Sequence, residues 1–307
     1  MERFRDAEAL PRKLRAPAVA LGNFDGVHVG HQDLLRIAVE HARRRGAESV
    51  ALTFDPHPAR VLAPDLAPPL IVGAERKAEL IAACDIDTLV VQPFDLGFAA
   101  RDAERFVREI VVDALGAVEV VVGYDFTFGR QRAGTAKALE QMGGRLGFAA
   151  VTVSPVAVDG LVVSSTKIRE FVLQARLSAA ALLLGRPFEV TGTVVPGRGR
   201  GRTLGIPTAN VEPEGELLPP PGVYAAWAEV RDERHAAVVN IGMAPTFADR
   251  VSPVIEAHLL GYQGDLYGAR MALLLKQQLR AELRFASPDA LVRQIRLDIA
   301  RAGELLQ

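Results

Sequence analysis

Two histidines, His28 and His31, lie in a glycine-rich stretch that reads AVALGNFDGVHVGHQDLL over residues 18–35. The apolar residues before Gly22 are typical of a strand, and an amphipathic helical pattern follows over residues 31–45. A loop between the carboxyl end of a strand and a helix N-terminus is a common ligand site, and its free N–H groups suit a phosphate. Histidine can donate hydrogen bonds to phosphoryl oxygens, more strongly when it is protonated. We therefore expect a phosphate site made of Gly22, Asn23, Phe24, His28, Gly30 and His31.

A plain strand–helix turn with two solvated histidines is the alternative for this loop. The glycines, Asp25 and the position between a strand and a helix favour the phosphate site. No Gly-Lys-Ser/Thr sequence follows the loop, so it is not a P-loop. The loop resembles the HxGH signature of nucleotidyltransferases, which transfer a nucleotidyl group from a nucleoside triphosphate.

Two further strands of the first half also end in residues that could bind a ligand. Residues 48–54 read as a strand that ends in Asp55-Pro56-His57-Pro58, either a binding turn or a turn with a helix cap. Residues 118–123 read as a buried strand, and the aromatic residues after it suit a planar ring or form a hydrophobic plug under a loop. The residues expected to face such a ring are Asp55, Asp125, Phe126 and Phe128.

Hydroxyls and an arginine meet at another expected helix start, in the sequence SSTKIR. Ser165, Thr166 and Arg169 there predict a second phosphate contact, because hydroxyls, free N–H groups and a guanidinium converge. A serine that serves only as an N-cap is the alternative, and it would need no arginine nearby.

The first half alternates apolar strands with helical patterns, which predicts a doubly wound parallel sheet. The expected strands are 18–22, 48–54, 88–92, 118–123 and 148–153, and the expected helices are 31–45, 74–84, 102–115 and 134–144. Within the helix over 74–84 we expect an exposed Lys77 and a buried Cys84.

Helical periodicity stops near residue 185, where a second domain is expected. The segments 188–195, 222–230, 236–242, 254–260 and 271–280 read as strands separated by Gly/Pro turns. Strands without intervening helices indicate a small antiparallel barrel. A final helix is expected from Pro288 to Leu305, with Ser287 as its N-cap and Leu291, Ile295 and Ile299 buried. The predicted domains are therefore 1–184 and 185–307.

The second half carries a glycine- and arginine-rich segment, PGRGRGRTLGIPTANV, over residues 196–211. Such a loop can wrap phosphates, and the residues expected to do so are Gly197, Gly199, Gly201 and Arg202. Arg-Gly repeats also suggest RNA binding, but the segment is short and the chain is not basic. Thr208 and Asn210 point the same way if the segment is extended, and their oxygens suit Mg²⁺ completed by phosphates.

The expected strand over 254–260 carries Glu256 and His258 on one face. A carboxylate inside a small barrel is costly unless it is paired or functional, and Glu256 could accept the proton of an attacking hydroxyl. The alternative is an ion pair between Glu256 and a barrel arginine such as Arg280. His258 is expected to be structural or to support its neighbours.

Composition limits the class of protein. The chain has 307 residues, a formal net charge of −1 and a single cysteine, Cys84, so an intramolecular disulfide or a cysteine zinc site is excluded. The charge argues against a general nucleic-acid binder, and no apolar run approaches the ~20 residues of a membrane span. We expect a cytoplasmic protein with small-molecule partners, no nucleic acid and no membrane. Assembly into a homo-oligomer stays open.

Motifs in both halves resemble one bacterial family, the bifunctional riboflavin kinase/FMN adenylyltransferases, also called FAD synthetases. GNFDGVHVGH, FDPHP, VGYDFTFG and SSTKIR resemble its adenylyltransferase half, over residues 18–184. GRTLGIPTAN, NIGMAPTF, VIEAHLL and LRAELRF resemble its riboflavin kinase half, over about 186–305.

The resemblance implies a Rossmann-like nucleotidyltransferase domain followed by a small antiparallel β-barrel with a C-terminal helix. It implies that Thr208 and Asn210 bind Mg²⁺–ATP, that Glu256 is the base, and that Arg280 and Glu282 bind flavin. The kinase half would phosphorylate the 5′-hydroxyl of riboflavin to give FMN. In the other half the FMN phosphate would attack the α-phosphorus of a second ATP, with His28, His31 and Arg169 as donors and no covalent enzyme intermediate.

Two other functions stay open from the residues. The first half could transfer a nucleotide to another phosphate ester, because an HxGH loop does not name the acceptor. The whole chain could instead be a flavin-binding or RNA-binding regulator that has lost catalysis, although the motif residues are intact.

Overall fold

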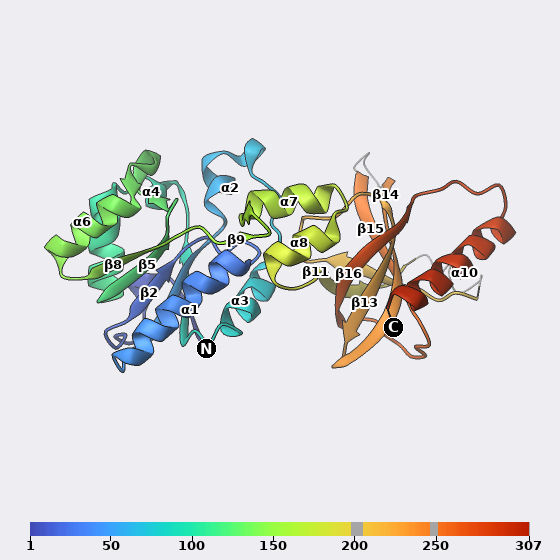
Figure 1. Ribbon diagram of the computed structural model, residues 1–307, viewed down its shortest axis with the longest axis horizontal. Coiled ribbons are helices and arrows are strands. Elements are labelled where there is room, and N and C mark those ends of the chain that lie inside the picture. The colour runs from blue at the N-terminus through green and yellow to red at the C-terminus, as the bar shows by residue number, and fades with distance from the viewer. Residues whose placement is uncertain (198–204, 246–250, 307) are drawn as a thin grey trace. The chain divides into compact units, whose positions relative to one another are not determined.

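A computed structural model of the chain describes residues 1–197, 205–245 and 251–306 (Figure 1). The chain divides into two compact units. The first comprises residues 1–69 and 74–163, and the second comprises residues 70–73 and 164–307.

The first unit is built on a six-stranded parallel sheet in the order β1-β4-β3-β2-β5-β8. Its strands are β1 (Glu2–Arg5), β2 (Ala18–Leu21), β3 (Ser49–Asp55), β4 (Thr88–Pro93), β5 (Glu119–Gly123) and β8 (Ala149–Val153). The expected parallel sheet is confirmed. Strand β1 at the edge of the sheet was not predicted, because residues 2–5 are mostly charged and contain no apolar run.

Helices cover both faces of this sheet, as a doubly wound fold requires. They are α1 (Val29–Arg44), α2 (Pro58–Leu62), α3 (Ala74–Ala82), α4 (Leu96–Ala99), α5 (Ala103–Phe106), a π-helical turn η3 (Val107–Ala114) and α6 (Ala136–Leu146). Leu35 of α1 and Ile81 of α3 pack against Ala20 on one face. Ile110 of η3 and Leu139 of α6 pack on the opposite face.

Two expectations about α3 are wrong. Lys77 is not exposed but half-buried, because α3 turns that side of the helix toward the ends of β2 and β3. Cys84 is half-buried rather than buried, since it follows the last residue of the helix and its Sγ lies 3.4 Å from the Leu80 carbonyl oxygen.

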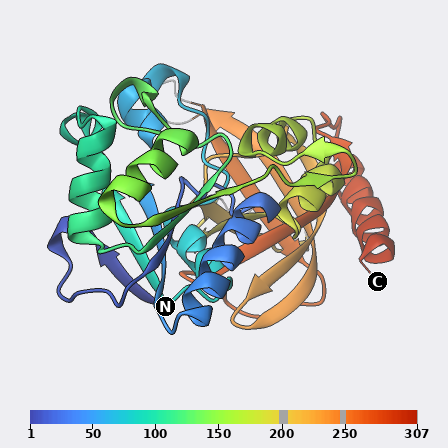
Figure 2. The ribbon, with the colours of Figure 1, turned by 60° about the vertical axis from the view of Figure 1, so that its left-hand side comes forward.

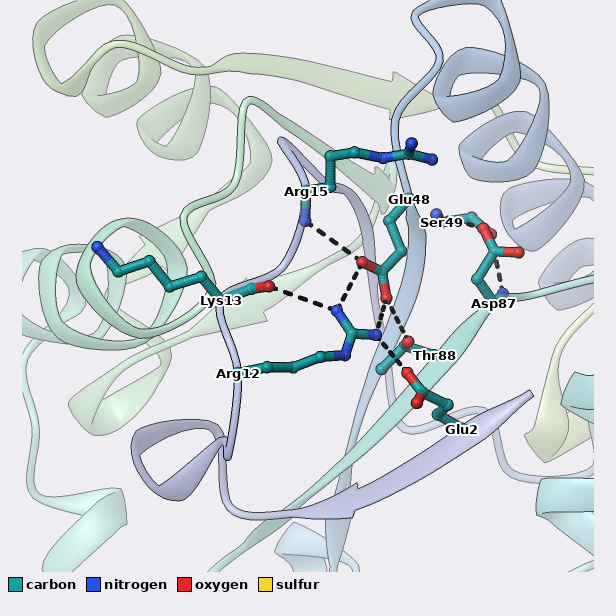
Figure 3. A network of polar contacts seen from close by, with 8 residues as sticks. All are labelled: Glu2, Arg12, Lys13, Arg15, Glu48, Ser49, Asp87 and Thr88. Carbon is teal, nitrogen blue, oxygen red and sulfur yellow. Dashed lines mark hydrogen bonds and ion pairs between the residues drawn. The ribbon is translucent and has the colours of Figure 1, made fainter.

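The amino-terminal edge of the sheet is held by a network of charged side chains (Figure 3). The Glu48 carboxylate accepts hydrogen bonds from Arg12 at 2.7 and 3.1 Å and from the Thr88 hydroxyl at 2.6 Å. The Arg15 backbone N–H also donates to it, and Arg12 pairs with Glu2 as well. The hydrogen bonds from Arg12 lower the pKa of Glu48 to about 2.

The second unit contains a closed antiparallel barrel in the order β11-β12-β15-β14-β13-β16 (Figures 1 and 2). Its strands are β11 (Phe188–Val195), β12 (Ala209–Pro213), β13 (Gly222–Val230), β14 (Glu233–Pro245), β15 (Val251–Leu259) and β16 (Arg270–Ala281). Two helices, α7 (Ser165–Leu173) and α8 (Leu177–Leu184), precede it. The expected barrel and final helix are confirmed.

The final helix, α10 (Pro288–Leu305), packs on the outside of the barrel, and the Ser287 hydroxyl caps it as expected. Ala302 of α10 packs with Val223, Ala225 and Val238. The expectation that Leu291, Ile295 and Ile299 are buried is wrong, because all three are half-buried. Leu291 and Ile295 line a pocket instead of being covered by the barrel.

Candidate functional site

Three oxygen-bearing side chains form a row across neighbouring strands of the barrel. Asn210 on β12 is the register partner of Glu256 on β15, and Glu256 is the partner of Asn240 on β14. Register partners present their side chains on the same face of a sheet, about 5 Å apart. Strand pairing therefore gathers residues that are far apart in the chain into one polar row.

The row faces a pocket of about 800 Å³ rather than the barrel interior. The interior is filled by the alternate residues of the same strands, among them Ile255 and Ala257, which are almost fully buried. The expectation that Glu256 lies inside the barrel is therefore wrong: it lies on the outer face, where water and substrates can reach it. The other polar residues that line the pocket include Thr208, His258, Arg280, Glu282 and Asp298.

The expected alternative for Glu256, an ion pair with Arg280, is not what the structure shows. The Arg280 guanidinium instead binds Asp298 of α10, with both Nε and one Nη at 2.9 Å from Oδ2. Gln294 donates to the same carboxylate at 2.9 Å. Within residues 1–197, 205–245 and 251–306, no ion pair engages Glu256.

The segment around Thr208 is held close to the row by two contacts. A Cβ on Gly197 would lie 1.9 Å from Nδ2 of Asn210, so a larger residue there would displace the Asn210 side chain. His258 Nδ1 donates to the Pro207 carbonyl at 2.8 Å, which places the proton on Nδ1 and anchors the residue before Thr208. The expected phosphate-binding residues Gly199, Gly201 and Arg202 lie outside the described residues.

Asp298 was not expected from the sequence. It is one of the buried charged residues of the chain, at 5% exposure, and fixes the orientation of Arg280 beside the pocket. A signal was present in the sequence, because Asp298 interrupts the apolar stripe of an amphipathic helix three residues after Ile295. Glu282 lies close to Gly242, where an added Cβ would come within 2.5 Å of its Oε1.

In the first unit, the histidine loop joins β2 to α1 as expected. His28 is the N-cap of α1, and its Nδ1 accepts a hydrogen bond from the backbone N–H of His31 at 3.2 Å. The two rings stack with centroids 3.5 Å apart. The backbone between them and β2 is strained, because Phe24 and Val27 have φ values of 49° and 40°. The loop therefore holds its rings in one arrangement.

Burial disfavours the cationic form of His31. The pKa of His31 lies well below its ordinary value of 6.5, chiefly because of burial and also because of the nearby His28 and Lys77. Its Nδ1 is buried without a hydrogen-bond partner among the described residues. Protonation of His31 is therefore unfavourable at neutral pH, so its hydrogen bonds are not strengthened in the way the sequence suggested.

The aromatic segment after β5 shows the packing of a plug. Phe128 is buried in the core, and Phe126 stacks on it at 5.5 Å. Asp125 and Asp55 are exposed at the ends of their strands. His57 caps α2 by accepting from the Ala59 N–H, which is the helix-cap alternative for that turn.

The SSTKIR segment forms the start of α7, with the Ser164 hydroxyl as its cap. Ser165 and Thr166 lie in the first turn, and Arg169 is buried at 9% exposure. These residues belong to the second compact unit, whereas the histidine loop belongs to the first.

A Rossmann-like sheet with an HxGH loop and a barrel with a polar row define a chain that combines a nucleotidyltransferase fold with a kinase barrel. The family model for FAD synthetase matches residues 10–167, and that for riboflavin kinase matches residues 184–306. The bifunctional riboflavin kinase/FMN adenylyltransferase of Pseudomonas fluorescens is 37% identical over 99% of this chain and 98% of its own length. The enzyme of the same name from Bacillus subtilis is 35% identical over 91% of this chain and 89% of its own.

The chain belongs to the family of bifunctional riboflavin kinase/FMN adenylyltransferases. It phosphorylates riboflavin to FMN with ATP and adenylylates FMN to FAD, in the domain order that the motifs indicated.

A solved structure described as a macrolide-efflux protein from Streptococcus pneumoniae shares the fold, with a TM-score of 0.87, 28% identity and 99% of each chain covered. Among the described residues of this chain, none of the helices has both the length and the apolar character needed to span a bilayer.

Proposed function

We propose that riboflavin is phosphorylated in the barrel pocket, with Glu256 as the base. The observation that carries this assignment is the row of Asn210, Glu256 and Asn240, which faces the pocket with Glu256 free of an ion pair among the described residues. Glu256 accepts or orients the proton of the 5′-hydroxyl as its oxygen attacks the γ-phosphorus of ATP. Arg280, held by Asp298, and Glu282 orient the flavin.

The residues around Thr208 fit a divalent cation, and we assign Mg²⁺. Thr208 and Asn210 offer hard hydroxyl and amide oxygens, and Gly197 leaves the room that its neighbour Asn210 needs. Phosphate oxygens of ATP would complete the shell, as is common for Mg²⁺ at nucleotide sites. When bound, the ion neutralises charge on the ATP phosphates. Gly197 is the residue of the glycine-rich segment that we assign to those phosphates; Gly199, Gly201 and Arg202, which the sequence assigns to the same role, lie outside the described residues.

We propose that FMN is adenylylated at the histidine loop. The FMN phosphate is already ionised at neutral pH, so the step needs hydrogen-bond donors rather than a strong base. Gly22, Asn23, Phe24, Gly30 and the two histidines supply them from the first unit. Ser165, Thr166 and Arg169 are the donors assigned from the start of α7, and Asp55, Asp125, Phe126 and Phe128 are assigned to the flavin.

We also propose that the functional domains are 1–184 and 185–307 and that the protein is cytoplasmic. Its proposed partners are riboflavin, FMN and ATP rather than nucleic acid, a proposal that the formal net charge of −1 supports.

A time course tests these assignments. Riboflavin, ATP and Mg²⁺ are incubated with the protein, and the flavins are separated at intervals. We expect FMN to rise first and FAD to follow, with FMN formation absent when Mg²⁺ is removed by a chelator and restored when it is added back. Formation of FMN at full rate in the chelator would overturn the metal assignment, and flavin binding without turnover would favour a regulator.

A further inference from the structure

Lys77 places its ammonium group at the carboxyl ends of β2 and β3, next to the histidine loop. It comes from α3, and its Nζ lies 3.4 Å from the Asn23 carbonyl oxygen and 3.3 Å from the Thr53 hydroxyl. The side chain is half-buried, and burial lowers its pKa from the ordinary value of 10.5. Burial of an ammonium costs free energy unless it is paired and hydrogen-bonded, so its presence here points to a role in the site.

The loop does not need Lys77 as a tie. The Thr53 hydroxyl already donates to the Asn23 carbonyl at 3.0 Å, a shorter contact than that of Lys77. This hydrogen bond joins β3 to the loop by itself. The contacts of Lys77 thus add a charge to a connection that exists without it.

Among the described residues, the ammonium of Lys77 makes no direct ion pair. Asp25 and Asp55 lie near enough to raise its pKa, but in the described part of the chain no carboxylate oxygen lies within ion-pair distance of Nζ. Both of its hydrogen-bond acceptors are neutral, and an ammonium has three N–H groups. The hydrogen bonds to Asn23 and Thr53 leave one N–H of the ammonium for a ligand.

His31 does not supply such a charge, because burial lowers its pKa and so favours the neutral ring. Yet the phosphate groups that the loop is assigned to bind are strongly anionic. We propose that Lys77 contacts the phosphates of ATP during adenylyl transfer and stabilises the departing pyrophosphate. This proposal rests on the assignment of adenylyl transfer to the histidine loop.

The reaction then balances without a proton from Lys77. An oxygen of the FMN phosphate forms a bond to the α-phosphorus of ATP, and the bond from that phosphorus to the bridging oxygen of the β-phosphate breaks. Pyrophosphate leaves with the electron pair. The ammonium acts as a fixed positive charge for the negative charge that develops on the leaving group.

The test compares Lys77→Met with Lys77→Arg and with Lys137→Met, a control at an exposed lysine of α6. We expect Lys77→Met to lower kcat/KM for FMN adenylylation by about a hundredfold. It should also raise the inhibition constant of pyrophosphate by about tenfold or more, because the ammonium contacts pyrophosphate directly. A lysine that only held the loop in place would leave this constant unchanged. Lys77→Arg should retain most of both, and riboflavin kinase activity in the same chain should not change.

Thr53→Val separates binding from positioning, because it removes the hydroxyl tie and keeps the ammonium. If Thr53→Val reproduces the loss, or if the pyrophosphate constant of Lys77→Met equals that of the native chain, Lys77 acts on the loop and the proposal is wrong. If Lys77→Met does not fold, the alkaline pH profile of FMN adenylylation decides. As the pH rises, the rate of the native chain should begin to decline at a pH lower than 10.5, where the ammonium loses its proton, and in Lys77→Arg this decline should occur at a higher pH. An unmoved profile overturns the proposal.

The same preparation distinguishes the two levels of assignment. If His28→Asn/His31→Ala loses adenylylation but Lys77→Met keeps the native rate, only the proposed role of Lys77 is wrong. Normal rates in both refute the assignment of the reaction to the histidine loop.

Discussion

The barrel pocket takes Asn210, Glu256 and Asn240 from three neighbouring strands, whereas the histidine loop takes both of its rings from one turn between a strand and a helix. In the barrel, register alone fixes the distances, and a slip by one residue would turn every one of these side chains to the opposite face. In the loop, positive φ values at Phe24 and Val27 fix the arrangement, at a cost of about 1–3 kcal/mol each. Regular pairing and local strain thus serve the same purpose.

The two regions also differ in charge. Glu256 faces its pocket as a carboxylate without an ion pair among the described residues, which suits a site that must accept a proton. The histidine pair is stacked and His31 is neutral, which suits a site that must donate hydrogen bonds to an ionised phosphate. The two regions therefore differ in kind: the barrel pocket offers a carboxylate, and the loop offers neutral donors beside the ammonium of Lys77.

The largest effect that tests this contrast is expected for Glu256→Gln, which removes the charge and keeps the shape. Loss of a general base lowers rates by about 10²–10⁴-fold, so FMN formation from riboflavin should nearly cease. Conversion of added FMN to FAD should continue at the native rate. Both are measured by chromatographic separation of flavins, with Glu229→Gln, at an exposed position of β13, as the control. Loss of both activities in a folded chain would contradict two separate sites.

The reverse effect is expected for the combined change His28→Asn/His31→Ala. Asparagine retains an N-cap acceptor for α1, so the variant removes the rings with little cost to the helix. Removal of such donors costs about 10²–10³-fold, so FAD formation should fall by this factor while FMN formation persists. His235→Ala in the barrel is the matched control. An equal fall in FMN formation would show that the change acts through folding.

The sequence predicted the loop well because everything that defines it is local. Glycines, histidines and the change from apolar to helical periodicity all occur within residues 18–35. The partners of Glu256 were harder, since the register of β12, β14 and β15 is a property of the folded sheet. Even so, the alternation of apolar and polar residues in β15 correctly placed Glu256 and His258 on one face.

Residues that act across elements were missed. Lys77 was expected to be exposed, because a helical pattern does not reveal which strand ends a helix side faces. Asp298 was missed for the same reason: its partner Arg280 lies on β16, 18 residues earlier. Glu256 was also assigned to the barrel interior instead of the outer face. Alternation along a strand defines two faces, but it does not say which one points into the barrel.

A smaller effect is expected for Asp298→Asn. The change leaves Arg280 without its charged partner beside the pocket, so the guanidinium loses its fixed orientation. We expect the KM for riboflavin to rise by about tenfold with a lesser change in kcat, in line with the loss of one charge-assisted hydrogen-bonded pair. Glu304→Gln, exposed near the end of the same helix, is the control. A fall in kcat at unchanged KM would mean that Arg280 does not orient the flavin.

The smallest effect is expected at the opposite edge of the first unit's sheet, where Glu48 contributes to stability rather than to either reaction. Because Arg12 lowers the pKa of Glu48 from 4.5 to about 2, the folded state favours the ionised carboxylate. This contribution is complete above pH 4.5 and is lost as the pH falls from 4.5 to 2. Thermal unfolding midpoints of the native chain and Glu48→Gln should therefore differ at pH 7 and converge in acid, while both activities at pH 7 stay unchanged. Midpoints that fall in parallel would show that the network around Glu48 does not couple protonation to folding.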